Sequence, residues 1–284
     1  MVRRLIFLVV LASIALPIEA RILVQGHRGA RALRPENTLP AFEYAIAQGV
    51  DALELDMAVT KDDVLVISHN PEISSEICNG PKLDVPIRSL TLAQVKEYDC
   101  GAKKNPRFPK QVPVAGTRIP TLDEVFDLAP KGDFKFNIET KIFPDRPELT
   151  PAPEEFDRLV LESIRRHHVE SRVILQSFDF RTLRAMKKLD PSIPLSALIE
   201  GRADFVRAAR EAEAGIISPE YHSVTVENVK QAHDAGLQVI PWTADDPDAW
   251  RRLVDARVDA IITDDPAALI AWMKADSDKM KPPR

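Results

Sequence analysis

Two carboxylates stand two positions apart in the run ALELDMAV, at Glu54 and Asp56. In a β-strand, alternate side chains point to the same face, so both acids lie on one face of the predicted strand. Buried carboxylates are costly unless they pair with a cation, and their oxygens suit hard cations such as Ca²⁺ or Mg²⁺. The pair therefore indicates a metal site; the alternative is that one acid reaches solvent while the other forms a salt bridge.

A second polar pair, Glu139 and Lys141, has the same spacing in FNIETKIF, with Asn137 two positions earlier. Glu139 would complete a three-carboxylate cation site with Glu54 and Asp56. Lys141 would offer a positive charge to an anionic ligand. The alternative is an internal ion pair between Glu139 and Lys141.

Histidines stand at two further strand ends. His27 and Arg28 follow the run ILVQG, and His69 ends VLVISH. VLVISH is separated from ALELDMAV by only TKDD, a connection so short that it requires an antiparallel hairpin. Counting back from this turn places His69 opposite Glu54, to within one residue of register.

This set of side chains would suit a phosphate ester. A bound cation, Arg28 and Lys141 would hold phosphoryl oxygens. His27 and His69 would serve as general base and general acid. We expect the carboxylates beside His69 to favour its charged form, and the guanidinium of Arg28 to favour the neutral form of His27. Trp242, which closes QVIPW, would offer an aromatic wall to a polyol or else pack in the fold.

The other histidines are weaker candidates. His222 follows ISPEY at a strand end, and His233 lies in the predicted helix TVENVKQAHDAG. His167 and His168 end a predicted helix, where their positive charge would favour the helix dipole.

The elements that must position these residues alternate regularly. Amphipathic helical stretches separate eight short apolar runs: ILVQG, ALELDMAV, FKFNIE, VILQSF, PLSALI, AGIIS, QVIPW and DAIIT. This alternation predicts an α/β fold, a TIM (β/α)8 barrel, whose active sites lie at the carboxyl ends of the strands. The stretch 72–119 breaks the rhythm, and we interpret it as a small insertion in one βα loop. It contains Cys78 and Cys100, which we expect to form a disulfide in an oxidising compartment.

The amino-terminal residues 1–20 combine a basic start, the apolar run LIFLVVLASIAL and a small final residue, the pattern of a cleaved signal peptide. We therefore expect a secreted or periplasmic protein, with residues 21–284 as one barrel domain and no stable membrane insertion after cleavage. Without residues 1–20 the chain has 36 basic and 42 acidic residues, a net charge of −6. This balance argues against nucleic acid as a partner.

The motifs HRGARALRPENTLPAF, GVDALELDMAVTKDDVLVISHNP, FNIETK, PWTADDP and VDAIITDDP resemble those of glycerophosphodiester phosphodiesterases. The resemblance runs from residue 24 to about 270 and is interrupted by the stretch 72–119. It implies a TIM barrel that uses a divalent cation to hydrolyse glycerophosphodiesters to an alcohol and sn-glycerol 3-phosphate. It assigns the catalytic roles to His27 and His69. The metal ligands it implies are Glu54, Asp56 and Glu139, and the phosphate-binding residues are Arg28 and Lys141.

Two features of the family motifs bear on substrate choice. Glu36 and Asn37 belong to the family signature, and we interpret them as structuring the loop. Asp245 departs from the usual pattern, and we expect its charge near Trp242 to alter the leaving-group pocket. Two alternatives stay open: a lysophospholipase D- or C-like phosphodiesterase on the same barrel, and a glycerophosphodiester-binding protein without catalysis. The sequence leaves the oligomeric state open.

Overall fold

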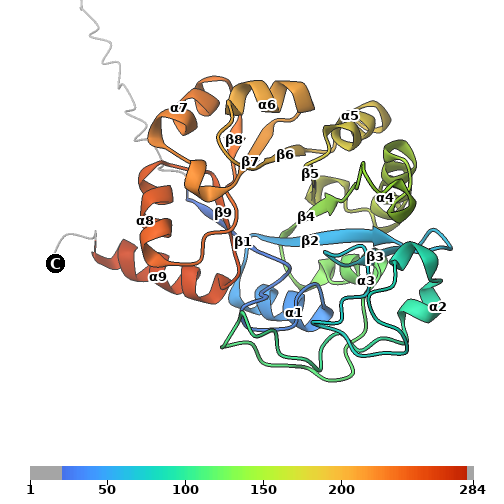
Figure 1. The fold of residues 1–284 in the computed structure, drawn as a ribbon. Coiled ribbons are helices and arrows are strands. Elements are labelled where there is room, and N and C mark those ends of the chain that lie inside the picture. Colours follow the sequence, from blue (N-terminus) through green and yellow to red (C-terminus); the bar gives the residue numbers. More distant parts are fainter. Residues whose placement is uncertain (1–20, 280–284) are drawn as a thin grey trace, which may run out of the picture.

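The computed structural model describes residues 21–279, and the proposed signal peptide, residues 1–20, lies outside the described part. Parallel strands form a ring in the order β8-β7-β6-β5-β4-β2-β1-β9. Figure 1 looks along this ring, with helices packed around its outside. The strands are β1 (Leu23–Gly26), β2 (Ala52–Val59), β4 (Lys135–Thr140), β5 (Val173–Ser177), β6 (Leu195–Ile199), β7 (Ile216–Pro219), β8 (Gln238–Val239) and β9 (Ala260–Thr263).

The TIM-barrel prediction is confirmed. All eight apolar runs contain strands, and backbone bonds from Asp259 N to Val239 O and from Ile262 N to Pro241 O join β8 to β9. β8 is shorter than the predicted run QVIPW. Pro241 explains part of this, because proline has no N–H to donate to a strand ladder.

Helices cover the barrel, and those from α4 to α8 are clearly amphipathic. They are α1 (Leu39–Gln48), α3 (Leu122–Phe126), α4 (Pro153–His167), α5 (Phe180–Leu189), α6 (Phe205–Ala212), α7 (Val226–Asp234), α8 (Pro247–Asp255) and α9 (Pro266–Lys279). Short side chains cap several of them: Thr121 forms a capping box with Glu124, and Asp179 caps α5. Among residues 21–279, no helix is both long and apolar enough to span a bilayer.

The predicted hairpin is present. β3 (Leu65–Ile67) pairs antiparallel with β2, with Val59 opposite Leu65 and Met57 opposite Ile67. This register differs by one residue from the count that placed His69 opposite Glu54. Asp63 explains the difference, because its left-handed conformation (φ 59°) lets the turn take one more residue than TKDD.

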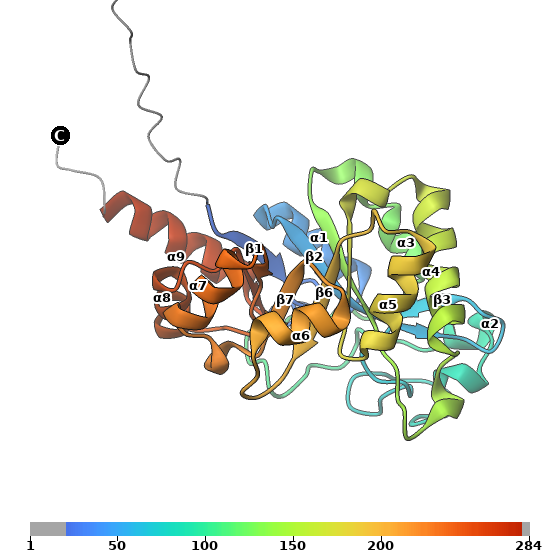
Figure 2. The same ribbon diagram turned by 90° about the horizontal axis from the view of Figure 1, so that it is seen from above.

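The stretch 72–119 contains the short helix α2 (Leu92–Val95) and lies against β3 (Figure 1). Figure 2 shows its loops gathered beside β3 and α2. Its apolar side chains form a small core of their own together with Ala58 of β2 and Val66 of β3. Cys78 and Cys100 form the expected disulfide within that core.

Candidate active site

The predicted site residues meet at the carboxyl ends of the strands. Asp56 of β2 lies next to Glu139 of β4 in the sheet, and His27 and Arg28 directly follow β1. A cavity of about 330 Å³ opens here. It is lined by His27, Arg28, Arg31, Glu54, Asp56, His69, Glu139, Lys141, Gln176, Phe178, Leu198, Glu200, Trp242, Thr243 and Ile262.

Three buried carboxylates form one cluster. One oxygen from each of Glu54, Asp56 and Glu139 lies within 4.8 Å of the other two. Burial, together with the negative charges of Asp56 and Glu139, raises the pKa of Glu54 well above its usual value. Burial likewise raises the pKa of Glu139 to about 7. Three buried oxygen donors at this spacing match what a hard divalent cation requires, so this group could hold a metal ion.

Two cations partly neutralise the cluster. The Nζ atom of Lys141 lies 3.1 Å from Oδ1 of Asp56 and 2.8 Å from Oε1 of Glu139. The Nε atom of Arg28 lies 3.3 Å from Oδ2 of Asp56. Burial alone would raise the pKa of Asp56, but Lys141 and Arg28 hold it well below its usual value. The Glu139–Lys141 ion pair considered from the sequence is thus present, and it is part of the cluster.

The loop after β1 is built around these acids. Arg28 adopts a left-handed conformation (φ 48°), and its backbone N–H donates to Oε2 of Glu54 at 2.9 Å. Its guanidinium donates to Glu36 at 2.6 Å, and the amide of Asn37 donates to Asp56 at 2.9 Å. Glu36 and Asn37 therefore do more than structure the loop, since both contact residues of the predicted phosphate and metal site.

His27 has a partner that the sequence analysis did not assign. Its Nδ1 atom lies 2.6 Å from Oδ1 of Asp264, and its Nε2 atom lies 3.9 Å from Glu54. A carboxylate that accepts the Nδ1–H bond leaves the Nε2 lone pair facing the cavity. Burial lowers the pKa of His27 against the opposing effect of Asp264, while Arg28 and Arg31 lower it further. The lowered pKa favours the neutral form, as expected, with burial rather than Arg28 as its main cause.

His69 lines the same cavity from the loop after β3. Its Nδ1 atom lies 2.9 Å from Oδ1 of Asn70. Burial lowers the pKa of His69 to about 4, because the attraction of Asp56 is smaller and Lys141 and Arg28 add to the lowering. Asp56 does favour the charged form of His69, as expected, but the effect of burial is larger, so the net shift of the pKa is downward.

An aromatic pair lies on another side of the cavity. The rings of Phe178 and Trp242 meet edge to face, with their centroids 5.5 Å apart. The indole N–H of Trp242 donates to the backbone oxygen of Ser218 at 2.8 Å, which fixes the ring at the mouth. Phe178 was predicted only as the end of a strand, yet its side chain is 47% exposed and lines the cavity.

The remaining histidines do not line this cavity. His222 is exposed and bonds to Glu220 at 2.7 Å. His167 contacts Asp123, and His168 ends helix α4 in a left-handed conformation. His233 bonds to Asp259.

Three residues that the sequence analysis did not assign support His27 and Glu54, namely Asp264, Arg31 and Gln176. Arg31 donates to Asp264 at 2.6 Å, and Gln176 donates to Oε1 of Glu54 at 2.8 Å. Two of the three had a signal in the sequence, since Gln176 is a polar residue inside a buried run and Asp264 stands at the end of the last strand.

Asp245 does not line the cavity. Its carboxylate accepts bonds from the hydroxyl of Thr263 at 3.0 Å and from the backbone N–H of Asp264 at 2.7 Å. Burial and the neighbouring charge of Asp264 raise the pKa of Asp245 to about 7. Asp245 therefore positions Asp264, and the expected effect on a leaving-group pocket is not supported by this geometry.

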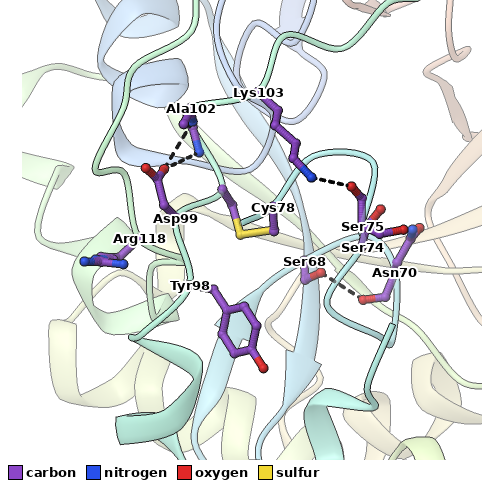
Figure 3. The surroundings of a disulfide bond; sticks show 12 residues. Ser68, Asn70, Ser74, Ser75, Cys78, Tyr98, Asp99, Ala102, Lys103 and Arg118 are labelled. Atoms are coloured by element: carbon purple, nitrogen blue, oxygen red, sulfur yellow. Dashed lines mark hydrogen bonds between the residues drawn. A yellow bond between two sulfur atoms is a disulfide. The ribbon is translucent and has the colours of Figure 1, made fainter. Parts of the chain in front are cut away.

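The disulfide borders the loop that carries His69. Figure 3 shows Cys78 close to Ser68 and Asn70, which are joined by a hydrogen bond of 2.8 Å from the Ser68 hydroxyl to the Asn70 backbone oxygen. A small pocket is lined both by His69 and by the two half-cystines. Elsewhere in the stretch 72–119, Gln111 donates to the backbone oxygens of Arg31 and Arg34. The stretch 72–119 therefore contacts the loops of both predicted catalytic histidines.

Comparison with known proteins gives one consistent result. Residues 27–268 match the model of the glycerophosphoryl diester phosphodiesterase family. A glycerophosphodiester phosphodiesterase of Caldanaerobacter subterraneus subsp. tengcongensis is 37% identical over 251 residues, which cover 88% of this chain and 97% of that protein. One from Bacillus subtilis is 31% identical, covering 87% of this chain and 84% of that protein.

Among solved structures, a crystal structure of a Silicibacter pomeroyi protein superposes with a TM-score of 0.83 at 31% identity. The superposition covers 90% of this chain and 95% of that chain. The family match over residues 27–268 includes all the site residues described above. The chain belongs to the glycerophosphoryl diester phosphodiesterase family.

Proposed function

We propose that this protein hydrolyses glycerophosphodiesters to an alcohol and sn-glycerol 3-phosphate in a reaction that depends on a divalent cation. The observation that carries the proposal is the composition of one cavity, in which three buried carboxylates, two histidines and two paired cationic side chains converge. Family membership supports the same activity. The substrate is a small molecule, and nothing in the proposal requires nucleic acid or a membrane.

In this proposal Glu54, Asp56 and Glu139 hold the cation, either Ca²⁺ or Mg²⁺. Their buried oxygens and mutual repulsion support the assignment, because a divalent charge would compensate both. When bound, the cation would supply positive charge to a phosphoryl oxygen.

Arg28 and Lys141 would bind the phosphate oxygens. Both are held at the cavity by Asp56, so their positions are set before a substrate arrives. The guanidinium fork suits two oxygens of one phosphate, whereas the ammonium acts as a point charge. Trp242 would form a wall against the carbon chain of the glycerol.

The two histidines would move the protons. His27 is proposed as the general base, because Asp264 fixes its Nδ1–H and leaves Nε2 facing the cavity. It would accept a proton from a water that attacks phosphorus directly, or from the glycerol 2-hydroxyl. Attack by that hydroxyl would expel the alcohol and give a cyclic phosphate, which a water would then open to sn-glycerol 3-phosphate. His69 is proposed as the general acid for the leaving alcohol. An anionic phosphate bound nearby would raise its low pKa, since an opposite charge stabilises the imidazolium.

Two alternatives use the same barrel, namely a lysophospholipase D- or C-like enzyme and a binding protein without catalysis. The presence of both histidines in the cavity favours an enzyme, since a binding protein has no need of a paired acid and base. We further propose that the protein is exported. The pattern of residues 1–20 and the Cys78–Cys100 disulfide support that proposal.

One experiment tests the proposed function. Purified protein is incubated with glycerophosphocholine, and sn-glycerol 3-phosphate is measured with a coupled enzyme, with and without a chelator. We expect release that stops with the chelator and returns when Ca²⁺ or Mg²⁺ is added. Absence of release with every divalent cation would refute the proposal, and cleavage of lysophosphatidylcholine alone would favour the lysophospholipase alternative.

A further inference from the structure

Glu200 is a charged residue of the active-site cavity that the proposed reaction does not use. It directly follows β6 and lines the cavity two positions beyond Leu198, which lines it too. Its side chain has no hydrogen bond or ion pair with any residue in the range 21–279. The other acidic residues of the cavity, Glu54, Asp56 and Glu139, each contact a cation or a donor. Glu200 is therefore an acceptor without a donor at the mouth of the site.

The position of Glu200 fits one end of a small polyol. In the ring of eight parallel strands, β6 lies four strands from β1 (Figure 1). Glu200, which follows β6, and His27, which follows β1, therefore line the cavity from opposite sides of the ring. The aromatic pair of Phe178 and Trp242 lines the cavity as well. A short carbon chain that starts at His27 and lies against these rings would end near Glu200.

The proposed reaction decides which arm of the substrate takes this path. Arg28 and Lys141, the proposed phosphate ligands, lie on the side of β1, β2 and β4, where both contact Asp56. In the route in which His27 accepts the proton of the glycerol 2-hydroxyl, that hydroxyl would lie at His27, and the rest of the glycerol arm would extend across the cavity toward the side that carries Glu200. The remaining primary hydroxyl, one carbon beyond, is the donor that reaches furthest.

We propose that Glu200 accepts a hydrogen bond from the free primary hydroxyl of the glycerol arm, and so selects glycerophosphodiesters over their acylated counterparts. The inference rests on the proposed function. An ionised carboxylate is an acceptor only, and it binds a hydroxyl more strongly than a neutral acceptor does. A lysophospholipid with an ester at that position has no hydrogen to donate, and its acyl chain would meet a charged group instead of an apolar surface.

The test compares two substrates that differ only in this hydroxyl. They are glycerophosphocholine and 2-hydroxypropylphosphocholine, which lacks the primary hydroxyl. We expect wild-type protein to prefer glycerophosphocholine by about tenfold in kcat/KM, the effect of one partly exposed hydrogen bond to a charged group. Glu200→Ala should reduce the preference to near one, and Glu200→Gln, which keeps an acceptor oxygen, should retain part of it. Asp145→Asn removes an exposed charge from the loop after β4 and should leave the preference unchanged.

Two results would overturn the inference. One is an unchanged preference in Glu200→Ala. The other is that the Glu200 variants lose activity toward glycerophosphocholine but keep it toward glycerophosphoglycerol. That result would mean that Glu200 binds a cationic head group.

Titration calorimetry separates this inference from the proposed function. It compares the binding of sn-glycerol 3-phosphate with that of 2-hydroxypropyl phosphate. Failure of the proposed function is an absence of turnover with either diester. Even then, a preference for sn-glycerol 3-phosphate that disappears in Glu200→Ala would support the role of Glu200, and equal binding by wild-type protein would refute it.

Discussion

Asp157 should make the stability of this protein fall as the pH rises toward 8. It lies on the inner face of α4, it is fully buried, and neither carboxylate oxygen has a hydrogen-bond partner among the described residues. Burial raises the pKa of Asp157 from its usual value of 3.8 to about 8. At neutral pH the folded protein therefore keeps a proton that the unfolded chain releases.

The direction and size of the change in the free energy of unfolding with pH follow from this difference in proton binding. Between the two pKa values the folded state holds one more proton, so the free energy of unfolding decreases with each unit of pH. The contribution of protonated Asp157 to the free energy of unfolding is fully present below about pH 4 and is lost as the pH rises through about 8. At about 1.4 kcal/mol per unit, the loss between pH 5 and pH 8 is at most about 4 kcal/mol. That is a large share of the typical 5–15 kcal/mol for a whole protein.

The assay is urea unfolding of wild-type protein and of Asp157→Asn at several values between pH 5 and pH 8. The asparagine cannot ionise, so the stability of the variant relative to wild type should grow by up to about 4 kcal/mol across this range. The titration of Glu54 and Glu139 affects both proteins equally and cancels. Asp145→Asn, at an exposed position in the loop after β4, should run parallel to wild type. A difference between Asp157→Asn and wild type that does not change with pH would show that Asp157 is ionised in the fold.

Three further results follow from the site and the disulfide. Glu54→Gln and Asp56→Asn should weaken the binding of divalent cations and lower turnover while the circular dichroism of the barrel is kept; unchanged turnover in metal-stripped Asp56→Asn would refute the metal assignment. His27→Ala and His69→Ala should each lower turnover by about 10²–10⁴-fold. p-Nitrophenyl phosphodiesters should partly rescue only His69→Ala, because that leaving group needs no proton. Rescue of His27→Ala instead would reverse the assigned roles of general base and general acid. Cys78→Ser should reduce the free energy of unfolding by roughly 3 kcal/mol under a loop-entropy model. Two free thiols in mass spectra of exported protein would refute this prediction, because no disulfide would then be present.

The barrel could be predicted because its signals are local. The run ALELDMAV matches β2 residue for residue, and the amphipathic stretches expected between the apolar runs are present as helices such as α4 and α5. The hairpin register was one residue off because it depends on the conformation of Asp63, which letters alone do not specify. That shift is small, yet it decides which residue of β2 faces His69.

The sequence could predict those site residues whose positions are set by the strand that carries them. Glu54, Asp56 and Glu139 needed only strand alternation and the alignment of strand ends. The bond between His27 and Asp264 joins positions 237 apart and requires that the barrel close between β1 and β9. Asp157 could not be foreseen, because an acidic residue in a helix is expected at the surface and only the packing of α4 shows otherwise.

The amides below the carboxylates also bear on how reliably the chain folds. Asn137 donates both to Gln25 of β1 and to Gln176 of β5, and Gln176 donates in turn to Glu54 of β2. This chain of bonds spans four strands and is complete only when all four are aligned. A slip of one strand by a single residue would turn its polar side chain toward the helices and leave buried partners unbonded. The same groups that shape the floor of the cavity thereby penalise misaligned barrels during folding.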